Sequence, residues 1–165
     1  MNSILRTMRF RLSLGLALVL MLAGAALPGP ARAADDAPAR VVGNWLTEPK
    51  DGIIQIAVRA DGVLEARIVG GNHPGRKDEK NPDATLRGLA LRGQLIVRDM
   101  KYEGAGHWSG GTIYDPDSGK TYKCNLDLSA PDTVRVRGYI GFSLLGRSQQ
   151  WTRYTGTSMD LPPAR

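Results

Sequence analysis

The sequence predicts an all-β protein, an antiparallel up-and-down β-barrel of about eight strands with little helix. Apolar and polar residues alternate with a period of two in several short stretches of residues 41–154. The turn pairs Asp51-Gly52 and Asp61-Gly62 enclose a run rich in β-branched residues. No window of about a dozen residues carries a helical apolar stripe. A β-sandwich is the alternative, but a barrel leaves no strand edge unpaired.

The strands follow one another at short intervals, each bounded by a turn or by glycines. One strand shows Leu64, Ala66 and Ile68 alternating with Glu65 and Arg67. The expected strands are residues 41–48, 53–60, 63–69, 94–101, 107–115, 120–128, 133–140 and 147–154.

The turn over residues 115–119, Asp-Pro-Asp-Ser-Gly, starts like a calcium loop and ends like a phosphate loop. It lacks the closing glutamate of the calcium loop and the helix that follows a phosphate loop. We interpret it as the turn of a hairpin, with proline and glycine setting its shape.

The N-terminus has the three parts of an export signal. Arg6, Arg9 and Arg11 precede an apolar run over residues 12–27, and an Ala-x-Ala site ends at Ala33. The run is shorter than the roughly 20 residues that span a bilayer. We therefore expect a signal peptide over residues 1–33, cleavage after Ala33, no transmembrane segment afterwards, and a periplasmic or secreted protein.

The rest of the chain divides simply. We expect a disordered lead-in over residues 34–40, a single barrel domain over 41–154 and a C-terminal tail over 155–165. The one long break in the strand pattern is 70–93, and its first part, 70–83, is highly charged. We expect this segment to be mobile, or to be the lid of the barrel if the barrel holds a ligand.

Charge and cysteine content exclude several classes of protein. The chain has 22 Lys and Arg against 16 Asp and Glu, and four of the arginines lie in residues 1–33. Subtracting these four leaves 18 basic residues against 16 acidic ones. This net charge is too small to indicate a basic surface that binds nucleic acid. Cys124 is the single cysteine, which excludes a disulfide framework and a zinc site of paired cysteines. It falls on the apolar side of its strand, so we expect a small buried residue.

No motif indicates an enzyme. His73 and His107 have no ligand spacing between them, and no serine lies in a nucleophile elbow. The acidic residues lie mostly at turns or on the polar side of an alternation. We therefore predict no catalytic residue, no metal site and no cofactor.

The leading functional hypothesis is a non-enzymatic barrel that binds a small apolar or amphipathic molecule among its inward side chains. A filled barrel that acts as a cell-envelope interaction protein is the alternative, with binding through its surface or through residues 70–93. An enzyme with a polar cavity is a third possibility. The candidate lining residues, taken from the apolar faces of the strands, are Ile54, Ile56, Val58, Leu64, Ile68, Leu95, Val97, Tyr122, Leu126 and Val136.

Trp45 and Arg153 form a candidate structural pair. Trp45 lies on the first expected strand and Arg153 on the last. If the barrel closes, these strands are neighbours, and the guanidinium can stack on the indole and seal one end. The alternative is a plain core tryptophan and a surface arginine. Both interpretations are structural, and neither makes the two residues a binding site.

Several blocks of the sequence occur in the order found in one family. They are Gly43-Asn44-Trp45-Leu46-Thr47, Asn81-Pro82, and residues 110–116, 119–124 and 137–153. Together they resemble the uncharacterised secreted bacterial family called domain-of-unknown-function family 2147, and the Gly-Asn-Trp block resembles a lipocalin motif. The resemblance implies an exported protein with a single lipocalin-like barrel and implies no established activity. Many members carry cysteines in the loop corresponding to residues 70–83; this chain has none there.

Overall fold

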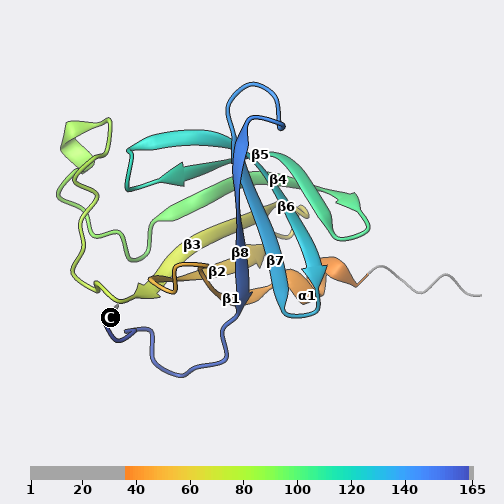
Figure 1. The fold of residues 1–165 in the computed structure, drawn as a ribbon, viewed down its shortest axis with the longest axis horizontal. Helices are drawn as coiled ribbons and strands as arrows, with labels where there is room; N and C mark the ends of the chain where they lie inside the picture. Colours follow the sequence, from red (N-terminus) through yellow and green to blue (C-terminus); the bar gives the residue numbers. More distant parts are fainter. Residues whose placement is uncertain (1–35, 164–165) are drawn as a thin grey trace, which may run out of the picture. The chain divides into compact units, whose positions relative to one another are not determined.

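The computed structural model describes residues 36–163, so the predicted signal peptide and its cleavage site lie outside the described residues. Eight antiparallel strands form a closed barrel in chain order, and β1 also pairs with β8 (Figure 1). This confirms the predicted up-and-down barrel. The elements are α1 (Ala37–Val41), β1 (Gly43–Leu46), β2 (Gly52–Val58), β3 (Leu64–Gly71), a 3₁₀ helix η1 (Ala84–Leu86), β4 (Leu95–Gly104), β5 (His107–Asp115), β6 (Lys120–Ala130), β7 (Thr133–Tyr139) and β8 (Gly146–Arg153).

Helix α1 stands where a disordered lead-in was expected. Ala37 and Val41 are buried in the core of the barrel, and Pro38 lies in the first turn of the helix. The Trp45 indole N–H donates a hydrogen bond to the Val41 carbonyl at 2.9 Å. So short a helix is not stable by its own propensity, which is the only property that the sequence pattern reports. Packing against the barrel stabilises it.

The C-terminal tail is also attached to the barrel. Gly71 donates its N–H to the Met159 carbonyl at 2.9 Å and accepts from the Leu161 N–H at 3.0 Å. Arg92 forms an ion pair with Asp160. A side chain at Gly70 would collide with the Met159 carbonyl, because an added Cβ would lie 2.1 Å from that oxygen. Glycine at position 70 therefore leaves room for the tail.

Successive connections alternate between the two ends of the barrel because every strand pair is antiparallel. We call the end with α1 and the turns 59–63, 105–106 and 131–132 the closed end. We call the other end, with the loops 47–51, 72–94, 116–119 and 140–145, the open end.

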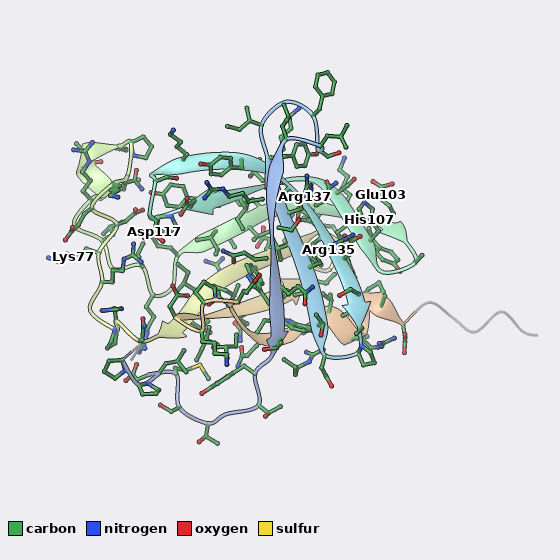
Figure 2. The ribbon with its side chains drawn as sticks, in the orientation of Figure 1. Lys77, Glu103, His107, Asp117, Arg135 and Arg137 are labelled. Carbon is green, nitrogen blue, oxygen red and sulfur yellow. The ribbon has the colours of Figure 1, made fainter. Side chains whose placement is uncertain are left out.

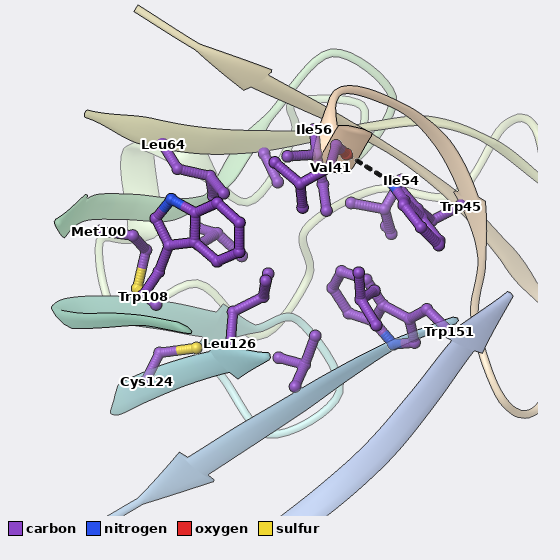
Figure 3. Packing of buried hydrophobic residues seen from close by; sticks show 14 of the residues in the cluster. Val41, Trp45, Ile54, Ile56, Leu64, Met100, Trp108, Cys124, Leu126 and Trp151 are labelled. Atoms are coloured by element: carbon purple, nitrogen blue, oxygen red, sulfur yellow. Dashed lines mark hydrogen bonds between the residues drawn. The ribbon is translucent and has the colours of Figure 1, made fainter. Parts of the chain in front are cut away.

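The core is concentrated toward the closed end. Trp45, Trp108 and Met100 are fully buried and belong to one hydrophobic cluster that also contains Val41 of α1 (Figure 3). Tyr102 packs on Trp108 with ring centroids 4.8 Å apart. Large side chains thus fill this part of the interior.

Candidate functional site

A cavity of about 1360 Å³ occupies the open half of the barrel. Its inner wall is mostly apolar, and its rim carries charged side chains together with the apolar Ile140 and Leu145. The apolar residues of the wall are Ile54, Ile68, Leu91, Ile96, Ile113, Tyr122, Val136 and Trp151. Gln149, which pairs with Val136, is a polar residue of the same wall. The interior is therefore filled at one end and open at the other.

The predicted lining residues divide between these two regions. Ile54, Ile68, Tyr122 and Val136 line the cavity. Ile56, Leu64, Val97 and Leu126 belong to the buried core cluster, and Val58 packs against it. The alternation identified which residues face inward, but it carries no information about how far each one lies from the open end.

Leu95 is the exception, because it lies neither in the cavity wall nor in the core cluster. The register of β3 with β4 shifts here: Ala66 pairs with Val97, and Arg67 pairs with Leu95. This bulge at Ile96 gives β4 one extra residue and reverses its alternation. Leu95 therefore lies opposite the exposed Arg67, and Ile96 takes the inward position.

Ile113 and Trp151 also line the cavity, although neither was among the predicted lining residues. Ile113 pairs with Tyr122, a predicted lining residue, and Trp151 pairs with Val134 of the core. Residues paired across neighbouring strands point to the same face. The pairing of the strands would therefore have identified both residues as inward-facing, but the sequence pattern alone did not.

The rim of the cavity carries charges of both signs. Arg76 forms an ion pair with Asp117, Asp115 accepts from the Ser118 hydroxyl at 2.7 Å, and Asp51 accepts from the Thr47 hydroxyl at 2.7 Å. Arg147 lines the same rim. Within residues 36–163 its guanidinium forms no ion pair or hydrogen bond, so it is the rim charge available to a ligand.

The charged segment after β3, expected to be mobile, is held by a buried carboxylate. Asp78 is fully buried and accepts hydrogen bonds from the Tyr114 hydroxyl at 2.6 Å and from the Asn81 amide at 2.7 Å. Burial and the neighbouring Asp78 raise the pKa of Tyr114 to about 12, so it stays a donor at neutral pH. The segment forms part of the cavity rim through Asn72, His73 and Arg76.

A second contact fixes the same segment to the turn between β5 and β6. Gly119 has φ +68, and a Cβ there would lie 2.0 Å from the Lys80 carbonyl oxygen. The Lys80 ammonium donates to the Asp117 carbonyl at 2.6 Å. The turn over residues 115–119 is thus the hairpin predicted, and its glycine also lets the charged segment approach.

Trp45 and Arg153 seal the closed end. They face one another across β1 and β8, and the guanidinium carbon lies 4.0 Å from the indole centroid. Arg153 donates to the Val42 carbonyl at 2.9 Å and to the Arg40 carbonyl, which ties α1 to the barrel. Gly43, at φ +133, is required beside them, because a Cβ there would lie 2.8 Å from the guanidinium.

The remaining reactive groups lie apart from the cavity wall. Cys124 is fully buried, as expected, and burial raises the pKa of its thiol to about 12. His107 bonds to Asp127 at 2.6 Å, and Arg135 pairs with the same carboxylate; Figure 2 labels His107 and Arg135. Across residues 36–163, no three His, Cys, Asp or Glu side chains converge as a metal site would need. In that same part of the chain, no helix is long and apolar enough to cross a membrane.

The fold has a solved counterpart. The chain is similar to a Helicobacter pylori protein, HP1028, described as belonging to the lipocalin family, with a TM-score of 0.63 and 18% identity. The similarity covers 70% of this chain and 83% of that chain. At this level of identity it shows the lipocalin-like fold alone. No curated protein matches the chain.

The family assignment has a separate basis, in the sequence. Residues 43–153 match the family described as an uncharacterized protein conserved in bacteria, DUF2147. The match starts at Gly43, beside the Trp45–Arg153 seal, and ends at Arg153 of that seal. It therefore covers the whole barrel, and the chain belongs to the DUF2147 family.

Proposed function

We propose that this protein binds one amphipathic small molecule in the open half of its barrel and is not an enzyme. The observation that carries the proposal is the cavity of about 1360 Å³, with a mostly apolar wall and charged side chains at its rim. Pockets of this character take up ligands mainly by burying apolar surface, and a few polar groups set the orientation. The lipocalin-like fold is consistent with such a role at a coarse level.

The rim favours an acidic headgroup. Its three carboxylates, Asp51, Asp115 and Asp117, are each engaged by neighbouring groups, whereas Arg147 has no acidic partner in residues 36–163. A guanidinium pairs well with a carboxylate or phosphate. The expected ligand therefore has an alkyl or isoprenoid part in the cavity and an anionic group at Arg147.

The N-terminal pattern adds a location to the proposal. Residues 1–33 would direct the protein out of the cytoplasm and be removed after Ala33. N-terminal sequencing of the exported protein should find Ala34 first. An intact Met1 in that sample would contradict the periplasmic or secreted location.

A thermal-shift titration tests the binding. A medium-chain fatty acid should raise Tm as its concentration rises, since a ligand of the folded state alone stabilises by about 2.7 kcal/mol at a hundredfold excess over its Kd. The alcohol of the same chain length should shift Tm less, because it offers Arg147 no charge. Arg147→Gln should reduce this difference between acid and alcohol.

A filling substitution provides the decisive comparison. Gly138 lines the cavity, and an added Cβ would make only ordinary contacts, at 3.4 Å to Ile113 and 3.6 Å to Tyr122. Gly138→Phe should therefore fold and abolish the shift. Thr121→Phe, which adds the same ring at an exposed position of β6, should retain it. Equal shifts in both variants would place any ligand outside the cavity, and no shift with fatty acids, isoprenoids or lipid headgroups would reject the proposal.

A further inference from the structure

The loop between β7 and β8 exposes an unusual amount of apolar surface. Its residues 140–145, which we call the β7–β8 tip, include Ile140, Phe142, Leu144 and Leu145, with exposed fractions of 67%, 81%, 89% and 75%. The loop stands away from the barrel wall at the top of Figure 2, with side chains projecting outward. Contiguous exposed apolar groups of this kind mark a contact with another apolar phase or with a partner.

All the charged residues of the hairpin that carries the tip are basic. Residues 133–154 contain four arginines and no aspartate or glutamate. Arg135 pairs with Asp127, and Arg153 pairs with Asp132. Arg137 and Arg147, the two nearest the tip in the sequence, form no ion pair with any carboxylate in the described range 36–163. The apolar tip is thus flanked by two positive charges without counter-charges.

Part of the backbone of the tip is already hydrogen-bonded. Arg137, labelled in Figure 2 at the base of the loop, donates to the Ser143 carbonyl at 2.7 Å and to the Leu144 carbonyl at 3.1 Å. The Leu145 N–H donates to the Phe142 carbonyl at 3.0 Å. Peptide groups satisfied in this way lose little when they leave water, whereas unpaired ones make entry into a bilayer costly.

We propose that the β7–β8 tip docks the protein on an anionic lipid bilayer. Phe142 and Leu144 enter the boundary between headgroups and acyl chains, while Arg137 and Arg147 remain at the level of the anionic headgroups. A bilayer fits these observations better than a protein, because a protruding apolar tip needs no preformed groove in a fluid phase. Ile140 and Leu145 also line the mouth of the cavity, so the bound bilayer lies against that opening.

The docking and the ligand binding share Arg147, but only the ligand needs the interior of the cavity, so a variant that fills the cavity separates the two proposals. Gly138→Phe, which should abolish the ligand-induced thermal shift, should leave vesicle binding unchanged. Loss of both with Gly138→Phe would show a general folding defect, which the Tm of the unliganded variant reports.

A fluorophore placed on the tip tests the docking at the site itself. Ser143→Cys offers an exposed thiol, while the buried Cys124 stays unlabelled. A polarity-sensitive dye at position 143 should shift its emission to the blue with vesicles of phosphatidylcholine and phosphatidylglycerol. The same dye at Ser129→Cys, exposed on β6 toward the closed end, should not shift. This readout is local, so residues 1–33 do not affect the comparison.

Matched substitutions test which residues are needed for binding to the vesicles. Binding is measured by co-sedimentation of the exported protein with the same vesicles. Leu144→Ser should weaken partitioning about tenfold. Leu89→Ser, the same change at a leucine 53% exposed in the loop between β3 and β4, should not weaken it. Arg147→Gln should cost about fivefold on anionic vesicles and nothing on pure phosphatidylcholine. Arg98→Gln, an exposed arginine on β4, should have no such effect.

Three outcomes would overturn the proposal. The first is equal dye shifts at positions 143 and 129. The second is equal losses for Leu144→Ser and Leu89→Ser. The third is a dimer of the wild-type protein in sedimentation velocity that Phe142→Ser converts to a monomer, with no change in vesicle binding. That result would show that the tip contacts a second copy of the chain.

Discussion

The two ends of the barrel are built from the same eight strands and the same alternation, yet they differ in what fills them. At the closed end the inward positions carry Trp45, Trp108 and Met100, all fully buried. At the open end they carry Gly138, Ile68 and Ile113 around a cavity of about 1360 Å³. The comparison teaches that alternation makes the barrel and that side-chain volume at each level decides whether its interior is solid.

The ends also differ in how they are held. The closed end is tied by α1, by the Trp45–Val41 hydrogen bond and by Arg153 stacked on Trp45. The open end depends on loops, above all on the segment anchored by Asp78. The β1–β8 seam between them is short, with two pairs of facing residues against seven between β7 and β8. A substitution at the closed end should therefore destabilise the whole barrel, and one at the open end should act locally.

The largest expected effect is at Trp45. Trp45→Ala should lower the free energy of unfolding by about 3–5 kcal/mol, since it leaves a cavity in a filled region. Ile113→Ala, in the wall of an existing cavity, should cost less than half as much. Urea denaturation of both variants measures the difference. Equal costs would show that the two ends are equally well packed.

Asp78 should have the next largest effect. Asp78→Ala leaves the partly buried Tyr114 hydroxyl without its acceptor and should cost about 2–3 kcal/mol. It should also make the bonds after Arg76, Lys77 and Lys80 sensitive to trypsin. Asp78→Asn keeps one acceptor oxygen, so its stability and its sensitivity to trypsin should lie between those of Asp78→Ala and the wild type. Unchanged proteolysis in Asp78→Ala would mean that Gly119 and Lys80 alone hold the segment.

Removing the stacking of Arg153 on Trp45 should have a smaller effect on stability. Arg153→Ala should cost about 1–2 kcal/mol, since it removes a stacked cation and its bonds to the Val42 and Arg40 carbonyls. A double-mutant cycle with Trp45→Ala should give a coupling of roughly 0.5–3 kcal/mol. Strictly additive costs would show that the stacking contributes nothing to stability.

The smallest expected effect is on the outer face. Burial acts to raise the pKa of Asp127, but the hydrogen bonds and charges of His107 and Arg135 outweigh it and lower that pKa. A carboxylate with a lowered folded-state pKa stabilises at neutral pH, and this contribution is lost as pH falls below the ordinary value of about 4. Asp127→Asn should cost about 1 kcal/mol at pH 7 and nothing at the lowest pH. A difference that persists in acid would assign the effect to packing.

Much of the architecture could be predicted from local pattern. The expected strand at 107–115 is β5 to the residue, and Asp61-Gly62 and residues 115–119 mark real turns. Asp51-Gly52 does not form the expected two-residue turn, because the loop runs over residues 47–51 and Gly52 begins β2. The pairing of Trp45 with Arg153 followed from closure alone. The prediction that Leu95 lines the interior was wrong, because a bulge gives no signal in the alternation of a sequence. Residues 70–83 were expected to be mobile, but their Asp78 is buried and hydrogen-bonded to Tyr114, which a charged run of sequence does not reveal.

The class of fold, the order of the strands and most of the inward faces follow from the sequence alone, because a period of two is a local property of the chain and antiparallel neighbours follow from short turns. Only the tertiary structure decided where the barrel is empty, since a void depends on which side chains meet at one level from different strands. It also decided that α1 closes one end and that Asp78 anchors the charged segment. Both result from contacts between residues distant in sequence, such as Arg153 with Val42 and Tyr114 with Asp78, and no local pattern encodes these contacts.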